Sequence, residues 1–177
     1  MNTKTFLLFF IGITIVGCSG DTPDSYFGKT TLNVNRYFNF GKRDFTSMQQ
    51  SQKQNMLIKL SDSEIGYTES YVEHIETYLI PLINEDIKKV KDLKPTTDTQ
   101  ELIDASLEVY TFIQQSYETD YMAIAKMMDA KESQNKIDAA IEQLQAEKAS
   151  LLNDKKNKLY FIAKPFAEKN GINAEFR

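Results

Sequence analysis

Between residues 61 and 170, apolar side chains recur at steps of three and four positions. This spacing places them along one face of an α-helix, and two short interruptions divide the pattern into three long runs. A helix with one apolar face is stable only where another element covers that face, and connections of a few residues make neighbouring helices antiparallel. The pattern therefore predicts an all-α fold, an elongated antiparallel up-and-down bundle of three to four long helices.

The first of these helices has a start, an irregularity and an end that can be located in the sequence. Ser61-x-x-Glu64 has the form of a capping box, which predicts a helix that begins there and continues through Ile65. Pro81 lies inside the periodic run and predicts a bend, because proline removes one backbone hydrogen bond. Pro95 predicts the end of this helix.

The other two helices carry similar signals. Asp98-x-x-Glu101 predicts the start of the second helix, and the third is expected to begin at about Ser133. Asn170-Gly171 predicts the end of the third helix. Two i, i+4 ion pairs are expected on the outer faces, Glu85–Lys89 and Asp154–Lys158.

Residues 31–59 fit two patterns. Leu32, Val34 and Phe38 alternate with polar residues as in a strand, whereas Phe38, Phe45 and Met48 have helical spacing. A single strand would have no partner with which to form a sheet. We therefore expect a helix over 31–59, broken near Gly41.

The N-terminus has the three parts of an export signal, with Lys4 in a polar start, an apolar run over 6–16, and Gly17 before Cys18. The run is shorter than the roughly 20 residues that a membrane-spanning helix needs. The sequence Ile-Val-Gly-Cys at 15–18 resembles the lipobox of bacterial lipoproteins, in which the signal is cut before the cysteine and its thiol receives acyl chains. The alternatives are a signal peptide with an incidental cysteine, or a buried free thiol.

The lipobox resemblance implies a signal peptide over 1–17 and lipid attachment at Cys18, the only cysteine in the chain. Residues 18–30 are rich in Gly, Pro, Asp and Ser and are expected to form a lipidated flexible tether, with the helical bundle over 31–177. Cleavage removes Lys4 and leaves 20 basic against 25 acidic residues, a net charge of −5. This balance argues against binding nucleic acid or anionic lipid headgroups by bulk electrostatics. The expected acyl chains identify the membrane as a partner.

The residue types needed for catalysis or metal binding are sparse. His74 is the only histidine, and the Glu-x-x-His motif of helical metal sites would need a glutamate where Tyr71 stands. His74 is expected at the surface or boundary of a helix, without metal, and no catalytic residue or cofactor is predicted. The carboxylates Glu69, Glu73 and Glu76 are interpreted as a solvated face.

Tyrosines at helical spacing are the unusual feature of the composition, since the chain has nine of them and no tryptophan. Their spacing follows the core stripe, which favours packing inside the bundle with hydroxyl groups at its edge. The alternative is the wall of a ligand groove or partner surface. The tyrosines concerned are Tyr67, Tyr71, Tyr78, Tyr110, Tyr117 and Tyr121.

From residue 90 onward, the segments KDLKP, DASLEVY and KPFAEKNGI, together with Tyr117 and Tyr121, resemble a family of small helical surface lipoproteins of Bacteroidota and spirochaetes. The family has no assigned function. The resemblance covers about half of the chain and implies a four-helix bundle without catalytic residues.

These features favour a lipid-anchored, non-enzymatic envelope lipoprotein that acts as a binding or scaffold module with a protein partner. Ser19, rather than aspartate, follows the cysteine, which by analogy with enteric sorting favours the outer membrane and leaves open whether the protein faces the periplasm or the cell surface. The alternative is an immunity or inhibitor lipoprotein that captures a toxin in the periplasm, since an acidic protein suits a basic target. An enzyme or metal carrier that uses His74 ranks last.

Overall fold

The structure is a computed structural model that describes residues 21–61 and 64–175. It is mostly helical with one two-stranded sheet, which confirms the prediction of a mainly helical chain. The predicted signal peptide over 1–17 and the predicted lipid attachment at Cys18 lie outside the described residues. No helix in the described ranges is both long enough and apolar enough to span a bilayer.

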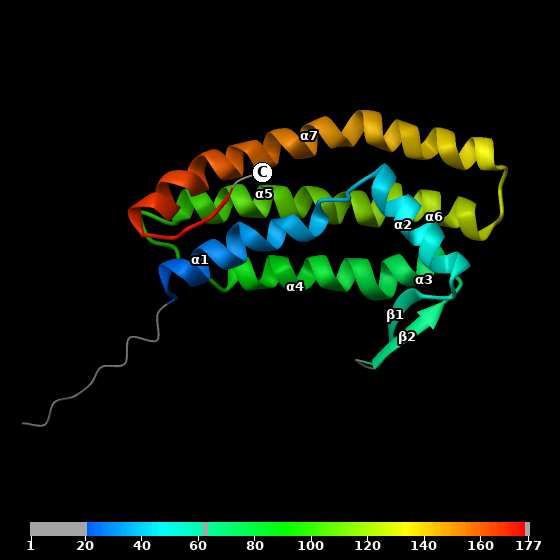
Figure 1. The fold of residues 1–177 in the computed structure, drawn as a ribbon, viewed down its shortest axis with the longest axis horizontal. Coiled ribbons are helices and arrows are strands. Elements are labelled where there is room, and N and C mark those ends of the chain that lie inside the picture. Colours follow the sequence, from blue (N-terminus) through cyan, green and yellow to red (C-terminus); the bar gives the residue numbers. More distant parts are fainter. Residues whose placement is uncertain (1–20, 62–63, 176–177) are drawn as a thin grey trace, which may run out of the picture.

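Three long helical stretches lie side by side, and the chain reverses its direction at each connection between them (Figure 1). The middle stretch contacts both of the others, because α5 packs against α4 and against α7. The first stretch is α3 (Tyr71–His74), a π-helical turn (Ile75–Leu79) and α4 (Ile80–Lys91); the second is α5 (Gln100–Ser116), a π-helical turn (Tyr117–Tyr121) and α6 (Met122–Asp129); the third is α7 (Gln134–Lys169).

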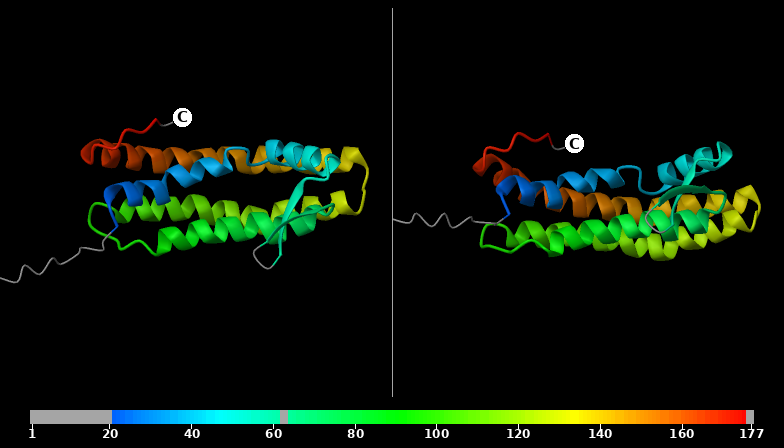
Figure 2. Two further views of the ribbon diagram at one scale, coloured as in Figure 1. Left: turned by 60° about the horizontal axis from the view of Figure 1, so that its bottom comes forward. Right: turned by 90° about the horizontal axis from the view of Figure 1, so that it is seen from below.

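The N-terminal part of the chain lies along these stretches as a series of short elements (Figure 2). Here α1 contacts α4 and α5, whereas α2 contacts α7. The elements are α1 (Pro23–Thr30), a 3₁₀ segment (Leu32–Tyr37) and α2 (Lys42–Lys53).

The flexible tether predicted over 18–30 is wrong from residue 23 onward, where α1 begins. Thr22 caps α1, since its hydroxyl accepts a hydrogen bond from the amide of Ser25, and Pro23 occupies the first turn, where a missing N–H costs nothing. Tyr26 and Phe27 are buried against the long helices. Burial of these two aromatic side chains and the hydrogen bond from the Tyr26 hydroxyl to the carbonyl of Lys94 hold the segment on the core, and composition alone does not reveal that.

The helix predicted over 31–59 is confirmed in part: the chain is helical in the 3₁₀ segment and in α2, with the expected break near Gly41, but α2 ends at Lys53 and the chain then enters a strand. Gly41 has a φ of +93°, and a Cβ at this position would meet Oε1 of Gln145. The same oxygen accepts a hydrogen bond from the amide of Lys42 at 3.0 Å. The positive φ favours glycine at position 41, and the Gln145 side chain occupies the space that a Cβ would take.

A β-hairpin replaces the predicted start of the first long helix. Strand β1 (Leu57–Ser61) pairs with the antiparallel strand β2 (Glu64–Thr68), so Ser61 and Glu64 face each other across the hairpin instead of forming a capping box. Helix α3 begins only after Ser70, whose hydroxyl accepts a hydrogen bond from the amide of Glu73 at 3.1 Å. The sequence offered no partner for a strand within 31–59. The partner of β1 is β2, which begins three residues after β1 ends.

The π-helical turn before α4 lies where the sequence predicts a bend. The amide of Ile80 bonds to the carbonyl of Ile75, five residues back, and Pro81 follows at once. A π-helical turn inside an α-helix is one way to accommodate a residue that cannot donate a backbone hydrogen bond.

The remaining helix ends agree with the sequence in part. Ser133 is the N-cap of α7, and Asn170 and Gly171 end this helix with a φ of +68° at Gly171, as predicted. Helix α5 instead begins at Gln100, and Asp98 pairs with Lys169 at 2.5 Å. Of the two predicted surface pairs, Glu85–Lys89 is present at 2.7 Å, whereas Lys158 pairs with Glu108.

The core contains much of the aromatic composition. Tyr110, Tyr117 and Tyr121 are buried, which confirms the packing interpretation for these three tyrosines, whereas Tyr67 on the hairpin is 58% exposed. The ring of Tyr121 lies 4.7 Å from the rings of both Tyr117 and Phe45. Its hydroxyl accepts a hydrogen bond from the amide of Gly41 and donates one to Asp44. These contacts fix the start of α2 on the second long stretch.

Candidate functional site

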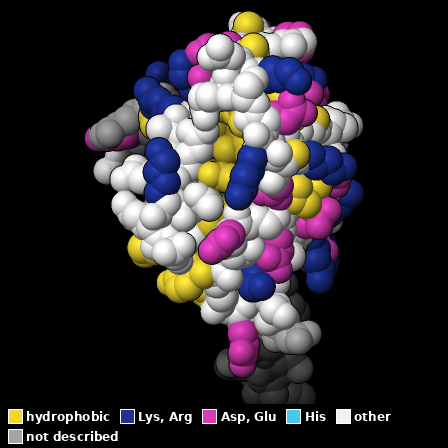
Figure 3. All heavy atoms as spheres, turned by 90° about the vertical axis from the view of Figure 1, so that its right-hand side faces the viewer, with side chains coloured by type: hydrophobic (Ala, Val, Ile, Leu, Met, Phe, Trp, Pro, Cys, Tyr) yellow, Lys and Arg dark blue, Asp and Glu magenta, His cyan; other side chains and the backbone are white. Residues whose placement is uncertain are grey.

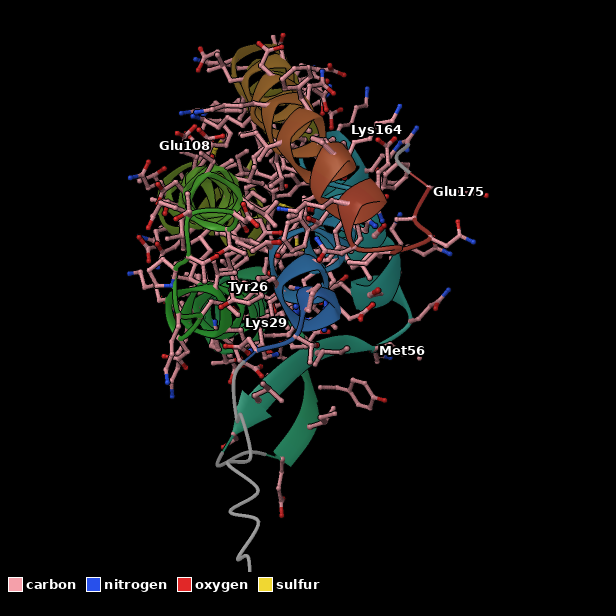
Figure 4. The ribbon with its side chains drawn as sticks, turned by 90° about the vertical axis from the view of Figure 1, so that its left-hand side faces the viewer. Tyr26, Lys29, Met56, Glu108, Lys164 and Glu175 are labelled. Carbon is pink, nitrogen blue, oxygen red and sulfur yellow. The ribbon has the colours of Figure 1, made fainter. Side chains whose placement is uncertain are left out.

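A groove runs between the 3₁₀ segment and α7 and has a volume of about 460 Å³. This is within the usual range for small-molecule sites. The segment that follows α7 turns back along the molecule and closes one side of the groove, with Glu175 on the opposite side of the molecule from Glu108 (Figure 4). The groove is lined by Phe27, Thr31, Leu32, Asn35, Phe38, Lys156, Tyr160, Ala174 and Glu175.

The period of the 3₁₀ segment builds the first wall of the groove. A 3₁₀ helix has three residues per turn, so side chains three positions apart share a face. Val34, Tyr37 and the following Phe40 are all buried in the core. The opposite face, with Leu32, Asn35 and Phe38, is left outside the core and lines the groove. Phe38 is 67% exposed, although it is a large apolar residue.

Helix α7 supplies the second wall. Lys156 and Tyr160 are one helical turn apart and therefore share a face, next to the buried stripe that contains Leu152 and Leu159. The Tyr160 hydroxyl donates a hydrogen bond to Oδ1 of Asn35 at 3.1 Å, which joins the two walls. Burial raises the pKa of Tyr160, so its hydroxyl stays protonated at neutral pH.

Lys156 is the distinctive group in the groove. Its side chain is half-buried, and burial lowers the pKa of its ammonium group. Within residues 21–61 and 64–175 no carboxylate pairs with it, whereas four of the other six lysines on α7 pair with one, such as Lys158 with Glu108. A desolvated ammonium group without a counter-ion is unfavourable unless an anion binds beside it.

A second hollow continues the groove beyond Lys156. It has a volume of about 220 Å³, shares Phe38 and Lys156 with the first, and is reached by Arg43 from α2. The Arg43 guanidinium lies 5.3 Å from the centre of the Phe38 ring. Two cationic side chains thus flank an apolar surface, an arrangement suited to a ligand with an apolar body and an anionic group.

His74 is buried, which contradicts its predicted position at the surface or boundary of a helix. Its Nδ1 lies 2.6 Å from the carbonyl oxygen of Ile58, and because a carbonyl only accepts, Nδ1 carries the proton. Burial lowers the pKa of His74, which keeps the ring neutral. It lines a cavity of about 150 Å³ together with Asp44. Among the described residues, no group of three or more potential ligands is placed to hold a metal ion.

The predicted solvated carboxylate face is only partly solvated. Glu69 and Glu76 are exposed, but Glu73 bonds to the hydroxyl of Thr68 at 2.5 Å and to the ammonium group of Lys59 at 3.0 Å. The Thr68 and Lys59 bonds hold the pKa of Glu73 below its usual value. Glu73 therefore attaches the hairpin to α3.

The groove was not predicted from the sequence. Its two walls come from residues more than 100 positions apart, and a period of three in residues 31–40 was the available local signal. Charged groups of both signs are mixed over the end of the molecule that carries the hairpin, with hydrophobic side chains visible between them (Figure 3).

Comparison of the chain with protein-family models, with curated proteins and with solved structures gave no match. The lipoprotein resemblance therefore stays a prediction.

Proposed function

We propose that this protein is a lipid-anchored, non-enzymatic binding protein of the bacterial outer membrane, built as an antiparallel helical bundle, whose groove takes an apolar anion. The observation that carries the binding role is Lys156, a half-buried ammonium group without a carboxylate partner in the described chain, set beside exposed Phe38. The lipobox-like residues that end at Cys18 support the membrane location.

The geometry of the groove favours binding over catalysis. Its described lining residues offer apolar contact from Phe27, Leu32 and Phe38, and hydrogen-bonding groups on Asn35 and Tyr160; the C-terminal segment adds one carboxylate, Glu175. A ligand carboxylate or sulfonate beside Lys156 would pair with its partly desolvated ammonium group, and an alkyl or ring body would cover the aromatic surface. A small lipid-like anion fits this description.

Replacing Cys18 with alanine is expected to release the protein from membranes. Without the thiol no acyl chain can be attached, and no described helix can span the bilayer in its place. Phase separation in Triton X-114 should move the protein from the detergent phase to the aqueous phase. Ser19→Ala is the control, because it keeps the thiol and should stay in the detergent phase. A Cys18→Ala protein that remains in the detergent phase would contradict the lipid anchor.

Replacing Lys156 with methionine is expected to weaken the binding of dodecanoate about tenfold, which corresponds to the loss of one charge-assisted contact of about 1.4 kcal/mol. Titration calorimetry with dodecanoate and with uncharged dodecan-1-ol separates the charged contact from the apolar one. The wild type should prefer dodecanoate, and the variant should bind both alike. Lys155→Met is the control, since Lys155 instead lies 5.8 Å from the Phe112 ring on another face of α7. Equal affinity of the wild type for both probes would contradict the proposed site.

A further inference from the structure

One face of the β-hairpin is apolar, half-buried on β1 and exposed on β2. Facing residues in the antiparallel pair share a side of the sheet, so Ile58 opposite Tyr67 and Leu60 opposite Ile65 form a single surface. Ile65 is 73% exposed and Tyr67 58% exposed, and Met56 next to them is also exposed. An exposed apolar surface on a projecting hairpin is typical of an interaction site.

The hairpin is held firmly by its other side. Leu57 is buried in the core, and the carbonyl of Ile58 accepts the hydrogen bond from His74. Lys59 bonds to Glu73, and the amide of Leu60 donates to the hydroxyl of Thr77 at 3.3 Å. Strand β1 is therefore fixed to α3 and the π-helical turn, so that the apolar face is presented in one direction.

The distance between the lipid site and the folded chain is short. Only Ser19 and Gly20 separate Cys18 from Asp21, so the Cα atoms of Cys18 and Asp21 are at most about 11 Å apart. The polar layer on each side of the hydrocarbon core is about 5–8 Å thick. With acyl chains on Cys18, the start of α1 at Pro23 must lie at the membrane surface.

The hairpin and the start of α1 lie on the same side of the molecule. In Figure 1 the hairpin projects beyond α4, away from α7, and α1 begins on this side at the other end; Figure 4, viewed along the molecule, shows the hairpin hanging below the helices. Between them α4 carries Lys88 and Lys91, which are exposed and have no carboxylate partner in the described part of the chain. Lysines at this position suit the phosphate groups of lipids.

We propose that the apolar face of the hairpin is a second membrane contact, which inserts Ile65 and Tyr67 into the interface of the bilayer that holds the acyl chains. This inference rests on the proposed acylation of Cys18. The molecule then lies along the membrane with its α4 side toward the lipid headgroups, and the groove, between the 3₁₀ segment and α7, stays clear of the lipid. Two contacts fix its orientation, which a single flexible attachment does not do.

The absence of tryptophan from the chain allows a direct test. Tyr67→Trp places the only tryptophan on the apolar face, and the acylated mature variant, which begins at Cys18, is reconstituted into vesicles of phosphatidylethanolamine and phosphatidylglycerol. Its emission should shift to shorter wavelength, and lipids brominated along the acyl chains should quench it. The control is Phe161→Trp. Phe161 is 83% exposed on α7 and lies two residues from buried Leu159, so it is on the outer face of that helix and should show neither effect. Adding Ile65→Asp to Tyr67→Trp should abolish the shift.

The anchor and the hairpin contact fail in different ways. If the Tyr67→Trp protein floats with the vesicles while its tryptophan emission stays unshifted and unquenched, the hairpin contact is overturned and the lipid anchor is left intact. Protein that does not float would overturn the anchor and the inference together. A shift that appears only with vesicles of whole envelope, and not with pure lipid, would identify a protein as the occupant of this face and would equally overturn the proposal. Circular dichroism checks that each variant keeps its helical content.

Discussion

Replacing Asp86 with alanine is expected to lower the free energy of unfolding by about 2–4 kcal/mol. Asp86 on α4 has a fully buried side chain that binds two residues of the N-terminal segment. The Arg36 guanidinium lies 3.0 and 3.2 Å from its two carboxylate oxygens, and the Tyr37 hydroxyl donates a hydrogen bond to it at 2.8 Å. Because Arg36 is 44% exposed, water offsets much of its loss. The larger cost comes from the buried Tyr37 hydroxyl, which would lose its acceptor.

Equilibrium unfolding in urea measures this effect. The matched control is Glu85→Ala, one position earlier, which removes an exposed pair with Lys89 and should cost less than about 1 kcal/mol. We also expect the 3₁₀ segment to become more accessible to protease in the Asp86 variant, since its polar attachment to α4 is lost. A change in unfolding free energy as small as that of Glu85→Ala would show that apolar packing alone holds the segment.

Replacing Asp44 with asparagine is expected to stabilise the protein at pH 7.5 by about 1–3 kcal/mol. Burial raises the pKa of Asp44 from 3.8 to about 6, although the hydrogen bond from Tyr121 favours the charged form. The folded state therefore holds a proton more tightly than the unfolded state, and this group destabilises the fold once it is ionised. Asparagine still accepts the bond from Tyr121 and removes the charge.

The pH dependence has a definite sign. The contribution of Asp44 is most favourable below pH 3.8 and is lost as the pH rises through about 6, so the advantage of Asp44→Asn should shrink toward zero at about pH 4. His74 acts in the opposite sense, because burial lowers its pKa and stability is lost as the pH falls below 6.5. Subtracting wild-type from variant stability at each pH cancels the His74 contribution. A difference that stays constant between about pH 4 and 7.5 would contradict the raised pKa.

The long helices could be predicted because their signal is local and repeated. Each turn of α5 or α7 adds another residue to the same apolar stripe, so single exceptions do not hide the period. The 3₁₀ segment has only two turns, and its period of three over Val34, Tyr37 and Phe40 resembles both a strand and a helix when it is read over a few residues. The hairpin was missed because Ile65 and Thr68 also extend the helical stripe that really begins at Val72.

The candidate site could not be read from the sequence. Lys156 is one of several lysines on α7. It differs from the others because it faces the groove wall that residues 31–38 form. That wall exists because Asp86 and Tyr110 bind the N-terminal segment from two other helices, through the Asp86 carboxylate and through a hydrogen bond from Tyr110 to the carbonyl of Lys29. The Lys29–Tyr110 pair is 81 positions apart, and no local pattern encodes it.

The placement of the N-terminal segment also sets the order in which the molecule can fold. Its contacts reach Ser106 from Thr30, Gln145 from Lys42, and Tyr160 from Asn35, a separation of 125 residues in the last case. Contacts of such long range form slowly, whereas each long helix can form from its own neighbours. We therefore expect the N-terminal segment to become native only after α7 has been synthesised, and until then its aromatic residues remain open to chaperones, proteases or other chains.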